Sequence, residues 1–133
     1  MTKSLFDASA LLALIHKEPG YIIAAEAIGH AAMSAANVGE VVGKLAERGV
    51  PPDRAQDIPF AFGIDVIPVD AVIAARAGTL RPITKRSGLS LGDRCCLATA
   101  ETYRLPVLTT DAAWTSLATP LNLDIRNIRA ETD

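Results

Sequence analysis

The sequence predicts an α/β protein in which helices cover both faces of a central parallel sheet of four to five strands. Short apolar segments alternate with longer segments whose apolar residues recur at helical spacing. Strands that alternate with helices indicate a parallel sheet, because each helix returns the chain to the edge where the next strand begins. The chain has 133 residues, of which half are hydrophobic, so it is long enough to form one domain with a sizeable core.

The first half of the chain sets up this alternation. It is predicted to contain strands at 3–7 and 31–34 and helices at 9–16, 21–29, 38–48 and 53–62. Pro19-Gly20 separates the first two helices, and Gly49-Val50-Pro51-Pro52 separates the last two. Alanine favours helices, which weakens the prediction of a strand at 31–34.

The second half continues the pattern. It is predicted to contain strands at 65–69, 107–109 and 124–128 and helices at 71–80, 91–103 and 112–117. The basic segment 81–88 is predicted to be a loop. Cys95 and Cys96 are adjacent in a predicted helix, where neighbours point about 100° apart, so a disulfide between them is geometrically poor. We expect both to be small buried side chains, as in a cytoplasmic protein.

Four carboxylates stand where strands end or helices begin: Asp7, Glu40, Asp93 and Asp111. Strand C-termini and helix N-termini share one edge of an α/β sheet, where binding sites form. Each acid alone can be explained as a helix cap, since Asn37-x-x-Glu40 and Ser90-x-x-Asp93 both match a capping box. Four acids at one edge raise each other's pKa, however, unless a cation offsets them. The joint pattern therefore favours a metal site.

This set of ligands suits hydrolysis of a phosphodiester. Mg²⁺ and Mn²⁺ prefer carboxylate and water oxygens, and they can activate water and stabilise a leaving oxygen. Hydroxyls at Ser9 and Thr109 lie two residues from an acid and could orient metal-bound water. Other chemistries lack their motifs: His16 and His30 have no partner at ligand spacing, and the sequence has no phosphate-binding loop and no nucleophile elbow.

Charge and hydropathy set only broad limits. The formal net charge of −2 permits a nucleic-acid substrate without indicating one, although neutralising the four acids would leave a mildly basic surface. No apolar segment approaches the ~20 residues that span a membrane, and no signal-peptide pattern is present. We therefore expect a cytoplasmic protein with no membrane association.

The ordered motifs resemble those of PIN-domain ribonucleases of the VapC-like toxin type, found in bacterial toxin–antitoxin pairs. Four segments carry the resemblance, at 5–14, 34–41, 89–98 and 105–111. Each contains one of the four acids, and the last also has the family's threonine, Thr109, two residues before Asp111. Any one segment is a weak signal, but the ordered set is specific and spans nearly the whole chain.

The resemblance implies a single PIN-like domain at 1–133, folded as a three-layer sandwich. It implies that the four acids bind Mg²⁺ or Mn²⁺ and, with Thr109, cleave RNA. It also implies a homodimer and a cognate antitoxin that covers the active site. The basic side chains of 81–88 could guide RNA and Arg94 could contact phosphate, although solvated side chains are the simpler interpretation of both. Two alternatives stay open: a catalytically weak module that binds RNA or antitoxin, and a phosphodiesterase that acts on DNA.

Overall fold

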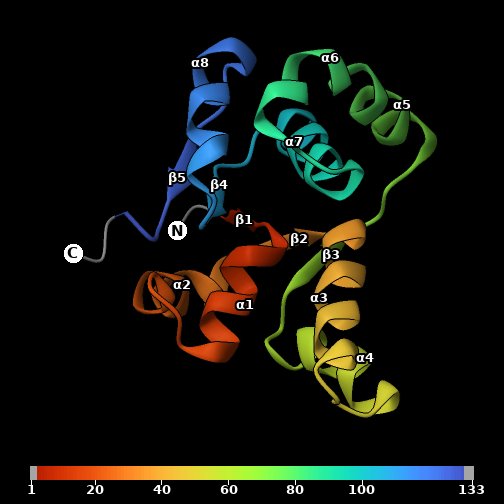
Figure 1. Cartoon of the computed structure of the whole chain (residues 1–133), viewed down its shortest axis with the longest axis vertical. Coiled ribbons are helices and arrows are strands. Elements are labelled where there is room, and N and C mark those ends of the chain that lie inside the picture. Colours follow the sequence, from red (N-terminus) through yellow and green to blue (C-terminus); the bar gives the residue numbers. More distant parts are fainter. Residues whose placement is uncertain (1–2, 131–133) are drawn as a thin grey trace.

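A computed structural model describes residues 3–130 and shows a five-stranded sheet between two layers of helices (Figure 1). Its strands, in chain order, are β1 (Ser4–Phe6), β2 (Ala31–Ser34), β3 (Asp65–Ile67), β4 (Val107–Thr109) and β5 (Ile125–Asn127). The order across the sheet is β3-β2-β1-β4-β5, and every neighbouring pair is parallel. The predicted fold class is confirmed, including the strand at the alanine-rich segment.

Helices connect the strands and form the two outer layers. They are α1 (Ala8–His16), α2 (Tyr21–Ala27), η1 (Ile28–His30), α3 (Ala35–Glu47), α4 (Pro52–Ala61), α5 (Ala71–Thr79), α6 (Arg81–Thr84), η2 (Lys85–Ser87), α7 (Leu91–Tyr103), η3 (Ala112–Leu117) and α8 (Ala118–Leu121). The elements labelled η are 3₁₀ helices. Within residues 3–130, no helix is long and apolar enough to cross a membrane.

Two local predictions were wrong. The segment 81–88 is not a loop, because α6 and η2 fill most of it. Pro82 lies in the first turn of α6, where a helix tolerates proline. The third helix begins at Ala35 rather than Val38, because Ser34 caps it by accepting a hydrogen bond from the backbone N–H of Ala36.

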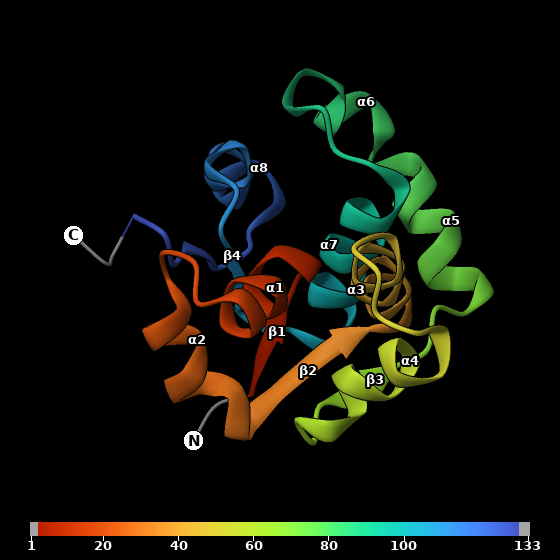
Figure 2. The same ribbon diagram turned by 60° about the horizontal axis from the view of Figure 1, so that its bottom comes forward.

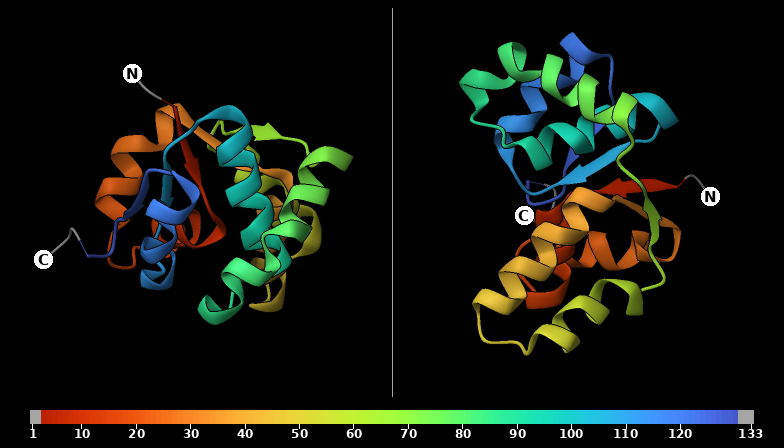
Figure 3. Two further views of the ribbon diagram at one scale, coloured as in Figure 1. Left: turned by 90° about the horizontal axis from the view of Figure 1, so that it is seen from above. Right: turned by 90° about the vertical axis from the view of Figure 1, so that its right-hand side faces the viewer.

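The strands alternate their side chains between two separate cores, one on each face of the sheet. Leu5 and Val107 pack with α5, α7 and η3, whereas Phe6 and Leu108 pack with α1, α2, α3 and α4. This alternation follows from the period of two in a strand. Figure 3 shows the two helix layers on opposite sides of the strands.

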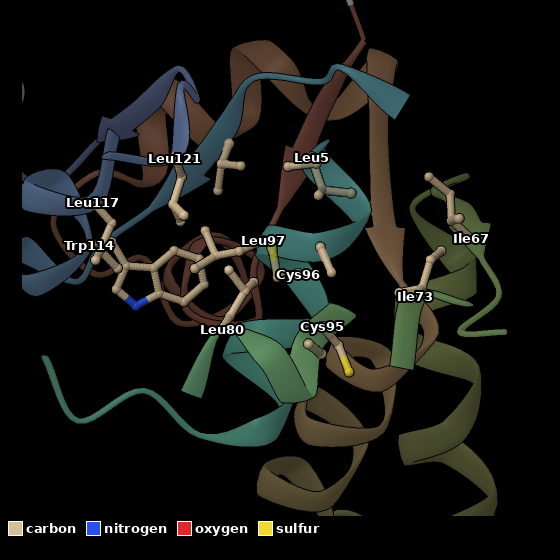
Figure 4. Packing of buried hydrophobic residues seen from close by; sticks show 14 of the residues in the cluster. Leu5, Ile67, Ile73, Leu80, Cys95, Cys96, Leu97, Trp114, Leu117 and Leu121 are labelled. Carbon is tan, nitrogen blue, oxygen red and sulfur yellow. The ribbon is translucent and has the colours of Figure 1, made fainter. Parts of the chain in front are cut away.

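The core beside α7 contains the two cysteines and the single tryptophan. Figure 4 shows Trp114 packed near Leu80 and Leu97, with Cys95 and Cys96 in the same cluster. Both cysteines are buried and unbridged, as predicted. Burial raises the pKa of the Cys96 thiol well above its ordinary value, so this thiol stays protonated.

The strand order places a topological switch point between β1 and β4. From β1 the chain moves to β2 and β3 on one side, and it then returns to β4 on the other side. Crevices outside the carboxyl ends of the strands form at such a point. Further along this edge, α3 packs against α7, and Figure 2 shows the two helices side by side.

Candidate active site

All four predicted acids line one cavity of about 280 Å³ at the carboxyl edge of the sheet. Asp7 follows β1, Glu40 lies on α3, Asp93 lies on α7 and Asp111 follows β4. The prediction that these acids converge on one edge is therefore confirmed in its geometry. Their cavity lies beyond the carboxyl ends of the paired strands β1 and β4, which is the place the topology favours.

Asp7 is the most buried of the four acids, with 3% of its surface exposed. It caps α1 by accepting a hydrogen bond from the backbone N–H of Ala10 at 2.8 Å. Thr109 donates its hydroxyl to Asp7 Oδ2 at 2.6 Å, and Ser9 donates to Asp7 Oδ1 at 2.7 Å. The β1–β4 register pairs Phe6 with Leu108, which sets Asp7 beside Thr109. Strand pairing thus fixes this carboxylate in place.

The same hydroxyls extend the network to the backbone that follows β4. Thr109 Oγ1 accepts a hydrogen bond from the backbone N–H of Asp111 at 3.1 Å. Ser9 Oγ accepts one from the backbone N–H of Thr110 at 3.0 Å. Both residues predicted to support the site therefore tie β1 to the turn that carries Asp111.

Burial raises the pKa of Asp7 to about 6. The hydrogen bonds from Thr109, Ser9 and Ala10 oppose this shift, whereas the nearby charge of Asp93 adds to it. Burial makes the charged form of this carboxylate unfavourable, and a nearby cation would stabilise that form.

Glu40 is held on the α3–α7 side of the cavity. The Asn37 side chain donates from Nδ2 to Glu40 Oε1 at 2.7 Å and to the backbone oxygen of Gly92 at 3.2 Å. A Cβ atom at Gly92 would collide with the Glu40 carboxylate, so only glycine allows this close approach. Burial raises the pKa of Glu40 and the charge of Asp93 raises it further, while Asn37 and Lys44 lower it.

The interpretation of Asn37 and Glu40 as a capping box is wrong, because Ser34 caps α3 and both residues lie inside the helix. The corresponding interpretation of Ser90 and Asp93 is confirmed: the Asp93 carboxylate accepts from the backbone N–H of Ser90 at 3.0 Å. Asp111 likewise caps η3 by accepting from the backbone N–H of Ala113 at 2.9 Å. Three of the acids therefore serve as caps and also face the cavity.

The ligands that this cavity offers are oxygen atoms, which suit a hard divalent cation such as Mg²⁺ or Mn²⁺. Among residues 3–130, no three Asp, Glu, His or Cys side chains already stand close enough to form a metal site. The four carboxylates thus share a cavity without meeting at one point. Asp93 interacts unfavourably with both Asp7 and Glu40, and a cation would relieve both interactions. The residues present fit such an ion.

Several residues of the site were not predicted from the sequence. Lys44 and Trp114 line the cavity, and Asn37 and Gly92 position Glu40. The spacing of four residues between Glu40 and Lys44 was a usable signal, because such pairs meet on one helix face. The close approach of Gly92 had no signal in the sequence, since it depends on how α3 and α7 pack.

Comparisons with known proteins agree with the fold. The family model of the PIN domain matches residues 4–119. No curated protein matches the sequence.

Solved structures share the fold at low sequence identity. A toxin–antitoxin complex from Klebsiella pneumoniae aligns with a TM-score of 0.70 and 23% identity, covering 95% of this chain and 98% of that one. The DNA-bound VapBC complex from Salmonella typhimurium aligns with a TM-score of 0.69 and 18% identity over 95% and 98% of the two chains. A VapBC complex from Rickettsia felis, bound to a DNA fragment from its promoter, aligns with a TM-score of 0.71 and 16% identity, covering 94% of this chain and 98% of that one.

Proposed function

The chain belongs to the PIN domain family, and from this we propose that it is a metal-dependent endoribonuclease that acts as the toxin of a toxin–antitoxin pair. PIN domains are generally nucleases. The observation that carries the proposal is the cavity that Asp7, Glu40, Asp93 and Asp111 line together at the switch point of the sheet. A fold gains little from gathering four carboxylates unless they bind a cation.

Mg²⁺ or Mn²⁺ would be held by these four acids. Such an ion, when bound, activates water and stabilises the leaving oxygen of a phosphodiester. Thr109 and Ser9 would keep the Asp7 carboxylate oriented through the hydrogen bonds described above. Asn37 would do the same for Glu40. These neighbours are positioning residues, because they act through the acids.

A cognate antitoxin is the proposed protein partner. Support comes from the fold shared with chains of toxin–antitoxin complexes from Klebsiella pneumoniae and Salmonella typhimurium. We further propose a single domain over 1–133, a homodimer and a cytoplasmic location. Ile22 on α2 and Val72 on α5 are 55% and 76% exposed, and these two helices offer apolar surface for dimer contacts. Sedimentation of the purified chain would test the dimer.

The central test is cleavage of RNA by the purified, partner-free protein. We expect discrete fragments of total RNA with Mn²⁺ and none with a chelator. Asp93→Asn should abolish cleavage and keep the fold, because the amide oxygen of Asn can still accept from the Ser90 backbone N–H. Asp70→Asn is the control, since the Asp70 carboxylate also accepts a backbone N–H at the start of a helix, that of Ile73 in α5, but lies outside the cavity. Full cleavage by the Asp93→Asn protein would remove the carboxylate mechanism.

One observation favours the alternative of a catalytically weak module that binds RNA or antitoxin. Within residues 3–130, no three acidic side chains lie close enough together to hold a metal ion. Metal titration separates the two functions. Trp114 lines the cavity and is the single tryptophan, so its fluorescence reports on Mn²⁺ binding there. Quenching that saturates near millimolar Mn²⁺ supports the nuclease, whereas no binding and no cleavage support the binding module. Competition between RNA and DNA would decide which nucleic acid is the substrate.

A further inference from the structure

A second pocket, of about 400 Å³, lies beside the acid cavity and has the opposite charge. Arg81, Lys85 and Arg94 line it together with Gly88, Leu89, Ser90 and Leu91. No Asp or Glu is among these lining residues. The pocket lies between α6, η2 and the start of α7, and Figure 1 shows these elements together with α5. We call it the basic pocket.

Arg94 is the unusual member of the basic pocket. It is 6% exposed, so the simpler interpretation of a solvated helix arginine is wrong. Its guanidinium carries five N–H groups, yet the bond from Nη1 to the backbone oxygen of Ala77, at 3.0 Å, is its one hydrogen bond among the described residues. The buried Nε atom has no partner there. A buried donor without an acceptor costs free energy, which an anion in the pocket would recover.

The other two basic residues of the pocket are also free to bind an anion. Arg81 and Lys85 are exposed, and neither side chain forms an ion pair or hydrogen bond with any other residue in 3–130. By contrast, Arg76 on the neighbouring α5 is paired with Glu101. Two unpaired cations beside a buried guanidinium favour an anion with several oxygen acceptors, such as a phosphate.

The first turn of α7 joins the basic pocket to the acid cavity. Ser90 lines the basic pocket, and its backbone N–H donates to the carboxylate of Asp93, which lines the acid cavity. One helical turn spans about 5.4 Å, so the two sites are immediate neighbours. A polymer with regularly spaced phosphates can occupy both at once.

We infer that the basic pocket binds a backbone phosphate of the RNA next to the phosphodiester held at the acid cavity. This inference rests on the proposed function, since it names a subsite for the same substrate. Arg81 and Lys85 would contact the phosphate from the rim, and Arg94 would contact it from the pocket wall. Exposed Leu91, at the start of α7, offers an apolar surface to the adjoining ribose or base. The simpler role for Arg94 is to cap the C-terminal carbonyls of α5, and a test must distinguish the two.

The Nε–H group of Arg94 gives a direct readout by nuclear magnetic resonance. The full chain in chelator would be titrated with inorganic phosphate and then with a short single-stranded RNA of mixed sequence. We expect the Arg94 Nε–H signal and the Gly88 and Leu91 amide signals to shift and saturate with both probes. No shift with either probe would show that Arg94 only caps α5, and this would overturn the inference. A shift with an oligoglutamate peptide but not with RNA would also overturn it, in favour of an acidic protein segment.

Affinity for the same RNA gives an independent test. The double variant Arg81→Gln/Lys85→Gln should bind about tenfold more weakly in chelator, and its salt slope should fall by about 1. Arg104→Gln/Lys17→Gln is the control with the same loss of charge, because Arg104 lies at the opposite end of α7, Lys17 lies at the end of α1, and neither lines the basic pocket. Equal weakening in the control would show that only overall charge matters and would overturn the inference. This binding measurement uses chelator and does not depend on cleavage. The proposed nuclease activity and the proposed phosphate subsite can therefore fail separately.

Discussion

The acid cavity has two walls that are built in different ways. The β wall consists of Asp7 and Thr109, at the paired ends of β1 and β4, and of Ser9 in the first turn of α1. The α wall consists of Asn37, Glu40 and Gly92, where α3 packs against α7. Asp7 on the first wall is buried, whereas Glu40 on the second is half-buried.

The difference lies in what holds each carboxylate. Asp7 accepts hydrogen bonds from three groups and is fixed by the sheet register, so moving it disturbs the core. Glu40 depends on one amide and on the missing side chain at Gly92. A change on the α wall can therefore move a carboxylate with little effect on stability. A change on the β wall alters stability and site geometry together.

Among changes that leave the four acids in place, Gly92→Ala should have the largest effect on activity, and it tests the α wall directly. The new methyl group would displace the Glu40 carboxylate, and a misplacement of about 1 Å can reduce a rate by about 10²-fold. Stability should be unchanged or slightly higher, because alanine is the better helix residue. Cleavage rates and thermal unfolding would be measured side by side.

Gly43→Ala is the matched control for that change. Gly43 also lies inside a helix, but an added Cβ atom would meet nothing within 4 Å. It should gain up to about 1 kcal/mol in stability and keep its activity. If Gly92→Ala kept full activity as well, Glu40 would be free to rearrange and the proposed difference between the walls would be lost.

Thr109→Val tests the β wall and should have a smaller effect on the rate. Valine keeps the shape of threonine but removes the hydroxyl that donates to Asp7 and accepts from the Asp111 backbone N–H. Loss of a hydrogen bond to a charged group costs about 1.5–3 kcal/mol, so both the unfolding free energy and the cleavage rate should fall, the latter about tenfold. Thr109→Ser should restore both. An unchanged melting temperature in the valine variant would show that the network does not hold the wall.

The sequence was sufficient to predict the β wall. Asp7 and Asp111 follow apolar strands, and parallel strands end at one edge, so their meeting could be inferred from order alone. The threonine two residues before Asp111 completed the same motif. The sequence pattern was enough for these residues because the side-chain period and the direction of the strands fix where they lie.

The sequence was not sufficient for the α wall or for the basic pocket. The role of Gly92 and the burial of Arg94 depend on how helices distant in sequence pack together, and spacing along one helix does not contain that information. The start of α3 was also predicted three residues too late. Asn37 was therefore interpreted as a helix cap, whereas it lies inside the helix and orients Glu40. Packing between elements, not their identity, accounts for these errors.

Asp7→Asn should change the stability of the metal-free protein only slightly, and the sign of that change separates a metal site from a simple cap. Burial raises the pKa of Asp7 from 3.8 to about 6, so the metal-free native state binds one more proton than the unfolded state between these values. Stability therefore falls as pH rises through this window, by roughly 3 kcal/mol in total. Asparagine removes that loss but weakens the hydrogen bonds, which leaves a net gain of about 1 kcal/mol, or roughly 4 °C, at pH 7.5.

The gain from Asp7→Asn should disappear at pH 4, where the wild-type carboxyl is already protonated in the folded protein. Thermal unfolding in chelator at pH 4 and pH 7.5 would measure both values. Saturating Mn²⁺ at pH 7.5 should reverse the order, because the wild-type protein gains binding energy that the variant lacks. A lower melting temperature for Asp7→Asn at both pH values would mean that the capping hydrogen bonds outweigh the buried charge. The β wall would then be a structural feature first and a metal site second.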